Sequence, residues 1–285
     1  MNVRGSGLRK LAYAGARYGP TALVKYSPAL FGVAFACVLP ELRKGIRANV
    51  RRLRGPRSAL AEEADVFRTF IAYAHCFAES MAGERPEAQA AQPVVCGREH
   101  LDRVIAEGRG AVLVTAHTGA WDAAARFLAR DYAADVLVVM AKERDAGARA
   151  VSDRVRIRGG IRVVHVGDHA VDALPLLGQL RRGGLVAIQL DRAVNPAAAV
   201  EVRLGSLPFL VPQGPFHLAK VSGAPIVPVF ARRLGYFRYE VTVFEPIRVE
   251  TKATRQDLAL AASAATRAME RYVLAHPTQW FHFAG

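Results

Sequence analysis

The chain has 285 residues, a formal net charge of +14 and 52% apolar side chains. This apolar fraction excludes an intrinsically disordered chain, and the length allows one large domain or two small ones. The three cysteines, Cys37, Cys76 and Cys96, form no CxxC pair, which argues against a disulfide-stapled secreted fold and a cysteine zinc site. We expect them to be small core side chains in a reducing compartment.

The positive charge is concentrated in the first fifth of the chain. Residues 1–57 contain 12 Lys and Arg and one acidic residue, Glu41, whereas the other 228 residues contain 27 basic and 24 acidic side chains. Such a segment suits a polyanion, either nucleic acid or an anionic membrane surface. The basic stretch 43–54 has no interleaved aromatic residue, and no nucleic-acid-binding signature follows it. We therefore predict an anionic membrane surface, and not nucleic acid, as the partner.

The first strongly apolar run extends from Ala29 to Leu39, between Pro28 and Pro40. At about a dozen residues it is shorter than the roughly 20 that a membrane-spanning helix needs, and it lacks the cleavage site of a signal peptide. Basic flanks around an apolar run are typical of a helix that lies in the membrane interface. The alternative is a buried helix beside a solvated charged one. We predict that residues 1–55 form basic amphipathic membrane-associating helices.

Residues 56–285 are predicted to form one α/β domain with a mostly parallel central sheet flanked by helices. Apolar residues at helical spacing predict a helix over 59–82. Beyond it, apolar strand candidates alternate with helical stretches, which is the pattern of such a sheet. Strands are expected at 111–116, 136–140, 161–166, 185–190, 226–231 and 239–244, and helices at 119–131, 146–158, 171–182, 214–222 and 254–275.

The segment VLVTAHTGAWD at 112–122 carries the most informative chemistry. His117 follows an apolar strand, at the edge where open α/β sheets form their sites. Asp122 falls in the first turn of the next helix, where we expect its carboxylate to orient the imidazole so that the other ring nitrogen accepts a proton. Gly119 allows close approach of the backbone. The alternative is a histidine and a helix-capping aspartate that never meet a substrate.

The sequence lacks the motif of a serine nucleophile, which limits the reactions that His117 could catalyse. The chain has no GxSxG nucleophile elbow, and no serine or cysteine lies near His117. The hydroxyl to be activated must then come from a substrate. A metal site in HVGDH, from His165 through Asp168 to His169, is the less favoured interpretation, because capping aspartates and solvated histidines are commoner in such loops. We expect no metal and no bound cofactor.

Several motifs together resemble one family. HTGAWD at 117–122 resembles the HX4D motif of glycerolipid acyltransferases, and its His-x-Gly-x-Trp pattern is similar to the bacterial lipid A biosynthesis branch. Three later blocks are similar to that branch in matching order, so that the resemblance covers roughly residues 40–283. They are LVAIQLDR at 185–192, LPFLVPQGPFHLAKVSGAPIVPVFARR at 207–233 and HPTQWFHF at 276–283.

The resemblance implies an enzyme that moves a fatty acyl group from a thioester to a lipid hydroxyl. It implies that His117 is the general base and Asp122 its orienting partner. It also implies that Arg156, or the neighbouring Arg158, stabilises negative charge on the thioester oxygen. Asp191 and Arg192 are expected to form an internal ion pair at the pocket edge or to touch the acceptor.

The donor implied is acyl carrier protein or acyl-coenzyme A, and the acceptor is a lipid similar to a lipid A precursor. The implied location is the cytoplasmic face of a bacterial inner membrane. Two alternatives remain at this point: an acyltransferase for another lipid, such as a lysophospholipid, aminolipid or glycolipid, and an inactive membrane-binding relative.

Overall fold

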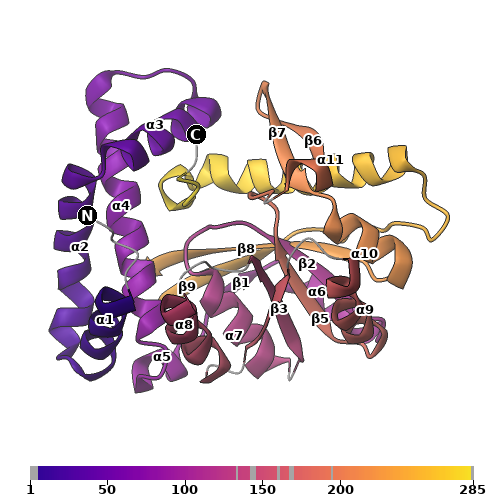
Figure 1. The fold of residues 1–285 in the computed structure, drawn as a ribbon, viewed down its shortest axis with the longest axis horizontal. Helices are drawn as coiled ribbons and strands as arrows, with labels where there is room; N and C mark the ends of the chain where they lie inside the picture. The colour runs from indigo at the N-terminus through magenta and orange to yellow at the C-terminus, as the bar shows by residue number, and fades with distance from the viewer. Residues whose placement is uncertain are drawn as a thin grey trace.

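The computed structural model describes residues 6–132, 134–141, 146–158, 161–166, 170–193 and 195–283. Within them, seven strands form one sheet in the order β1-β9-β8-β2-β5-β3-β4. All neighbouring pairs are parallel except β8 and β9. The predicted fold class, a mostly parallel sheet flanked by helices, is confirmed (Figure 1). The strands are β1 (Val94–Cys96), β2 (Ala111–Thr115), β3 (Val136–Ala141), β4 (Arg162–Val166), β5 (Leu185–Gln189), β8 (Ile226–Gly235) and β9 (Arg238–Val243).

Helices cover both faces of this sheet, because its central strands are apolar on both sides. One face packs against α9 (Leu174–Arg181), α10 (Gly214–Ser222) and α11 (Arg255–Ala275). The other face packs against α6 (Arg98–Ala106) and α7 (Trp121–Asp131). The other helical elements after residue 85 are α5 (Pro86–Ala90), α8 (Ala146–Arg158) and the short 3-10 turns η1 (Ala170–Ala173), η2 (Pro196–Ala198) and η3 (Pro277–Gln279).

A two-stranded hairpin, which the sequence analysis did not predict, stands apart from the main sheet. It consists of β6 (Ala199–Leu204) and β7 (Leu207–Pro212), paired in antiparallel register around Gly205 and Ser206. The hairpin rises above α11 in Figure 1. Val202, Leu204, Phe209 and Val211 point into the core, whereas the alternate residues face outward. The hairpin therefore packs its inner side chains into the core beside α11.

Four N-terminal helices lie together beside the α/β body (Figure 1). They are α1 (Ser6–Tyr18), α2 (Thr21–Val38), α3 (Pro40–Arg54) and α4 (Ala59–Met81). The expected short helix bounded by Pro28 is wrong, because α2 has 18 residues and continues through Pro28. It is long and apolar enough to cross a membrane by length and composition.

Helix α2 packs against α4 through one narrow stripe. Val24, Pro28, Gly32 and Ala36 are its buried residues, at a spacing of four. A Cβ atom at Gly32 would lie 2.6 Å from the Cα of Ile71 in α4, so the two backbones meet there without room for a side chain. Pro28 itself belongs to this buried stripe. Most of the other residues of α2 are exposed.

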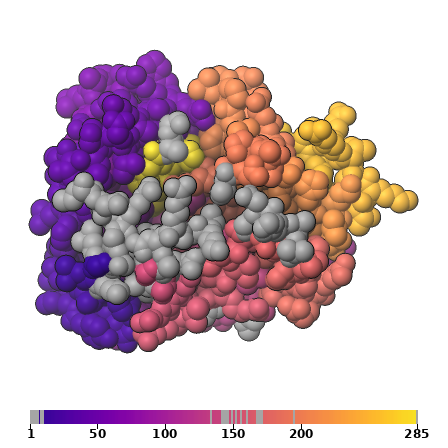
Figure 2. Space-filling model, in the orientation of Figure 1, coloured from indigo at the N-terminus to yellow at the C-terminus, as the bar shows by residue number. Residues whose placement is uncertain are grey.

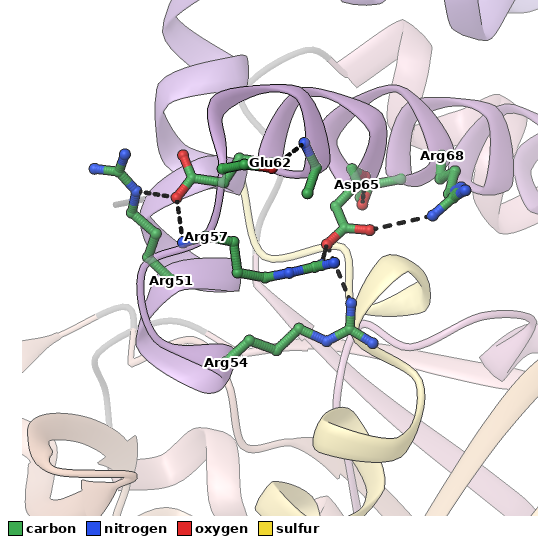
Figure 3. Close-up of polar contacts among 9 residues, drawn as sticks. Arg51, Arg54, Arg57, Glu62, Asp65 and Arg68 are labelled. Atoms are coloured by element: carbon green, nitrogen blue, oxygen red, sulfur yellow. Dashed lines mark hydrogen bonds and ion pairs between the residues drawn. The ribbon is translucent and has the colours of Figure 1, made fainter.

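We expected the basic residues of α3 to be free to meet an anionic surface, but several of them are paired inside the protein. Arg43, Arg47, Arg51 and Arg54 form one stripe that faces α4, where Glu62, Glu63 and Asp65 receive them. Figure 3 shows Arg51 on Glu62, with Arg54, Arg57 and Arg68 around Asp65. These ion pairs are internal contacts between two helices. They reduce the positive charge that residues 1–55 can offer to a membrane.

Two further expectations concern the burial of the cysteines and the boundary between the N-terminal helices and the α/β domain. Cys76 is buried as expected, but Cys37 and Cys96 are exposed, so the expectation that all three cysteines lie in the core is wrong. Residue 55 lies in the turn between α3 and α4. The division of the chain into 1–55 and 56–285 stays a prediction.

Candidate active site

Strand register brings His117 and Asp191 together. Strands β2 and β5 are parallel neighbours, and Thr115 pairs with Gln189 at their carboxyl ends. His117 and Asp191 each follow two residues later, so they leave the sheet side by side. The Nδ1 atom of His117 lies 2.8 Å from Oδ1 of Asp191, and the His117 amide donates to Oδ2 at 3.0 Å. The aspartate thus holds both the ring and the backbone of the histidine.

This pairing differs from the expected one, in which Asp122 orients His117. Asp122 instead accepts a hydrogen bond from the Ser80 hydroxyl at 2.6 Å and one from Nε of Arg156 at 3.1 Å. The reason is geometric: Asp122 lies on the first turn of α7 and faces α4 and α8, whereas Asp191 lies on the neighbouring strand end. The predicted hydrogen bond between Asp122 and His117 is therefore replaced by one in which Asp191 accepts from His117.

Asp191 is a buried acid whose pKa is held low. Its side chain is fully buried, and it accepts a third hydrogen bond from Nε1 of Trp280 at 3.0 Å. Burial alone would raise the pKa of Asp191, but the charge of His117 and the hydrogen bonds from it hold this pKa well below its usual range. A carboxylate here keeps the hydrogen on Nδ1 of the ring. That tautomer leaves the lone pair on Nε2.

The segment after α11 completes this arrangement. The amide of Phe281 donates to the His117 carbonyl at 2.7 Å, and the amide of Gly119 donates to the Gln279 carbonyl at 2.8 Å. The Gln279 side chain bonds both the amide and the carbonyl of Arg233 in β8, each at 2.8 Å. Residues 279–281 therefore clamp the loop 117–119 between β8 and Asp191. The HPTQWFHF block was noted in the sequence, but it was given no role there.

Gly119 has a structural reason to be glycine. Its φ of +42° lies in the left-handed region, and a Cβ atom would lie 2.5 Å from both the Ala231 carbonyl oxygen and the Arg232 Cα. The close approach that we expected at Gly119 is thus an approach to strand β8. Any side chain there would push the His117 loop away from the sheet.

Arg156 and Arg158 point to different neighbours. Arg156 packs on the ring of Trp121, with its Cζ atom 5.0 Å from the ring centroid, and bonds Asp122. It therefore lies beside the first turn of α7, the helix that follows the His117 loop. Arg158 instead reaches Glu84 at 3.0 Å and the Tyr13 hydroxyl at 3.2 Å, which ties α8 to the N-terminal helices. These contacts place Arg158 in a structural link.

The expected ion pair between Asp191 and Arg192 is wrong. The Asp191 oxygens are occupied by His117 and Trp280, while the Arg192 side chain is exposed and has no acidic partner among the described residues. Successive residues at a strand end point in opposite directions, so one is buried and the other reaches solvent. Arg192 is therefore available at the rim of the site.

The metal alternative finds no support in the part of the chain that is described, where no group of three metal-ligating side chains gathers. Nε2 of His165 instead bonds Asp153 at 2.8 Å. Asp168 and His169 lie outside the described residues. A separate open cavity of about 580 Å³ lies between α11 and the ends of β8 and β9, and neither His117 nor Asp191 lines it.

His117 has the geometry of a general base. Its side chain is 22% exposed, and Nε2 has no hydrogen-bond partner among the described residues. The buried hydroxyl of Thr118 next to it also has no partner there. A positioned imidazole with an ionised partner and one free nitrogen can remove a proton from a hydroxyl that enters from solvent.

Comparison with known proteins identifies the family of this chain. The family model described as bacterial lipid A biosynthesis acyltransferase matches residues 20–284. Phosphatidylinositol mannoside acyltransferases from two strains of Mycobacterium tuberculosis are each 24% identical, over 82% of this chain and 74% of theirs. The crystal structure of the 1-acyl-sn-glycerophosphate acyltransferase PlsC from Thermotoga maritima is similar with a TM-score of 0.38 and 15% identity, over 86% of this chain and 97% of that one.

Proposed function

The chain belongs to the bacterial lipid A biosynthesis acyltransferase family and is an acyltransferase, and we propose that it acylates a lipid hydroxyl by general-base catalysis at His117. The observation that carries this proposal is the hydrogen bond between His117 and the buried, ionised Asp191, which leaves Nε2 free. The family match supports a thioester donor and a lipid acceptor. The residue roles are our own assignment.

In the proposed reaction, the acceptor hydroxyl hydrogen-bonds to Nε2 of His117. The oxygen attacks the thioester carbonyl carbon while its proton moves to Nε2, and Asp191 balances the charge of the imidazolium. The carbon–sulfur bond then breaks, and the imidazolium returns the proton to the departing sulfur. An ester and a free thiol result, so atoms and charge balance without a cofactor.

Arg156 is proposed to stabilise the negative charge on the carbonyl oxygen. Its Nε is bound by Asp122, and its plane rests on Trp121, so the guanidinium is held in one orientation. In this assignment Asp122 is a positioning residue for Arg156, not for His117. Ser80 in α4 fixes the second oxygen of Asp122. The HX4D aspartate thereby links α4, α7 and α8.

The acceptor is proposed to be a glycolipid. The family description favours a lipid A precursor, and the names of the two mycobacterial relatives favour a mannosylated phosphatidylinositol. Both classes stay within one proposal, because each offers a hydroxyl on a membrane lipid. The donor is proposed to be acyl carrier protein or acyl-coenzyme A.

Membrane contact is proposed through the uncovered face of α2. Leu23, Tyr26, Leu30 and Val33 are between 40% and 74% exposed and lie opposite the stripe that packs on α4. An apolar face of this size on a helix is typical of an interfacial anchor. We propose that it lies against the cytoplasmic leaflet of the bacterial inner membrane and delivers the site to its lipid.

The function is tested with the purified full-length protein, acyl-coenzyme A or acyl carrier protein thioesters, and a total bacterial lipid extract. Mass spectrometry identifies the acylated product. His117→Ala is expected to lower the rate about a hundredfold or more, as for the loss of a general base, and Asp191→Asn is expected to lower it as well. His217→Ala, at an exposed position on α10, is the control. Unchanged turnover in His117→Ala would rule out the mechanism.

The membrane contact has its own test. Leu30→Asp is expected to weaken binding to phospholipid vesicles about tenfold or more, because burying a leucine is worth roughly 1.5–3 kcal/mol. Leu260→Asp is a matched control, since Leu260 is 61% exposed on α11, compared with 74% for Leu30. Equal flotation of the two variants would contradict the assignment of α2. Vesicles with and without anionic lipid measure how much charge contributes.

A further inference from the structure

Arg52 differs from the other arginines of α3. Arg43, Arg47, Arg51 and Arg54 face α4 and are paired with acidic side chains. Arg52 lies on another side of the helix and has no acidic partner among the described residues. Its Cζ atom lies 5.6 Å from the ring centroid of Phe209 in the hairpin. The Arg52 guanidinium thus packs on the Phe209 ring, and no acidic side chain among the described residues balances its charge.

A series of ring contacts connects Phe209 to Asp191 in the candidate active site. The ring of Phe209 lies 5.9 Å from that of His282 and 6.4 Å from that of Trp280. His282 stacks on Trp280, with ring centroids 5.2 Å apart, and Trp280 donates to Asp191. Figure 2 shows the yellow C-terminal residues between the purple N-terminal helices and the orange hairpin. Arg52 therefore stands at the rim of the His117 site.

A second uncompensated guanidinium lies at the same rim. Arg192 follows Asp191 directly, is exposed and has no acidic partner within the described ranges. Burial lowers the pKa of His282, and the guanidiniums of Arg192 and Arg52 lower it further, against the opposing effect of Asp191. The geometry agrees: Arg52 contacts Phe209, whose ring lies 5.9 Å from that of His282. Arg192 follows Asp191, which accepts a hydrogen bond from Trp280, the residue on which His282 stacks. The one buried acid nearby, Asp191, is already bound by His117 and Trp280.

We propose that Arg52 and Arg192 form a subsite that binds a phosphate group of a substrate at the rim of the His117 site. Guanidinium groups suit phosphate because their planar N–H pairs match two phosphate oxygens, and two of them balance its charge. Stacking on Phe209 orients the Arg52 guanidinium before the phosphate binds. The inference rests on the proposed acyltransferase function and adds the group by which one substrate is recognised.

Phosphate occurs in both substrate classes, so two pairs of probes separate its source. The donor pair is palmitoyl-coenzyme A and the palmitoyl thioester of N-acetylcysteamine, which has no phosphate. The acceptor pair is phosphatidylinositol mannoside and dodecyl mannoside, which also has none. Arg52→Gln and Arg192→Gln are compared with Arg68→Gln, which removes an arginine that is 69% exposed and shares Asp65 with two others.

We expect Arg52→Gln and Arg192→Gln to lower kcat/KM about tenfold or more for the phosphate-bearing member of one pair. The phosphate-free member should change less than about twofold, and the affected pair identifies the source. Arg52→Lys should recover only part of the loss, because lysine keeps the charge without the planar fork. Equal losses for both members of each pair, or no loss, would overturn the subsite.

A second measurement does not depend on turnover. Inorganic phosphate at constant ionic strength is expected to raise the Tm of the wild-type protein and of Arg68→Gln, but not that of Arg52→Gln. Equal shifts in all three proteins, or none in the wild type, would overturn the proposal. If the wild type transfers no acyl group to any acceptor, the proposed function fails, while the Tm comparison still decides whether Arg52 binds phosphate.

Discussion

The indole of Trp280 is the contact of Asp191 that can be removed with the least disturbance. Trp280→Phe keeps an aromatic ring at a position that is 3% exposed, but it deletes the Nε1–H that lies 3.0 Å from Oδ2 of Asp191. The two hydrogen bonds from His117 remain. The variant therefore asks what the third donor contributes to the carboxylate.

The size and pH dependence of the effect follow from burial. A hydrogen bond to a charged group is worth about 1.5–3 kcal/mol, and the Asp191 side chain is fully buried. Because the folded-state pKa of Asp191 is depressed, its contribution to stability is present above the unfolded-state pKa of about 3.9 and is lost as pH falls through the folded-state pKa. Trp280→Phe reduces this contribution. The deficit should be constant at every pH above the folded-state pKa of Asp191 in the variant, and it should shrink only below that pKa.

Urea unfolding between pH 7 and pH 3 measures the deficit, and the acyl-transfer assay at pH 7 measures activity. We expect activity to fall about tenfold, since a less firmly held Asp191 orients His117 less well. Trp121→Phe is the control for stability, because Trp121 packs on Arg156 and lies away from Asp191. A free energy of unfolding at pH 7 that equals that of the wild type, together with unchanged activity, would refute the reasoning.

Three further substitutions test the frame around the site. Gly32→Val should lower Tm and separate α2 from α4, since a Cβ there would lie 2.6 Å from the Ile71 Cα; a Tm equal to that of the wild type would contradict the close packing. Asp65→Asn should lower the free energy of unfolding by about 1–3 kcal/mol at pH 7, measured in urea, because several arginines lose a buried acceptor. Gly119→Ala should reduce acyl transfer sharply while far-ultraviolet circular dichroism stays native, and full activity would show that the loop tolerates a side chain.

The fold class could be predicted because the alternation of apolar strands and helices is a local signal. Each strand that the sequence predicted is present, within a few residues at its ends. The hairpin β6–β7 was missed because Leu207 to Pro212 lies in a stretch interpreted as a motif block, and its short strands are only half buried. The length of α2 was missed because Pro28 was taken as a boundary. Its place in a buried stripe depends on α4, which sequence spacing does not show.

The partner of His117 could be predicted only in part. The sequence placed both His117 and Asp191 at the carboxyl ends of strands, but the order of strands in the sheet is not a local property. Once β5 lies next to β2, the pairing of Thr115 with Gln189 makes their contact necessary. Asp122 was favoured because it is near in sequence. Distance along the chain was a poor guide here, since the hydrogen bonds to Asp191 span 74 and 89 residues.

The clamp at residues 279–281 has a consequence for biosynthesis. Helix α2 leaves the ribosome early, and its apolar face can settle on lipid while most of the sheet is still to be made. The loop 117–119 can donate a hydrogen bond to Gln279 and accept one from Phe281 only after residues 279–281 have been translated. Under the proposed function, the nascent chain would therefore reach the membrane before its active site is complete. Thioesters in the cytosol would then not be consumed by an incomplete enzyme.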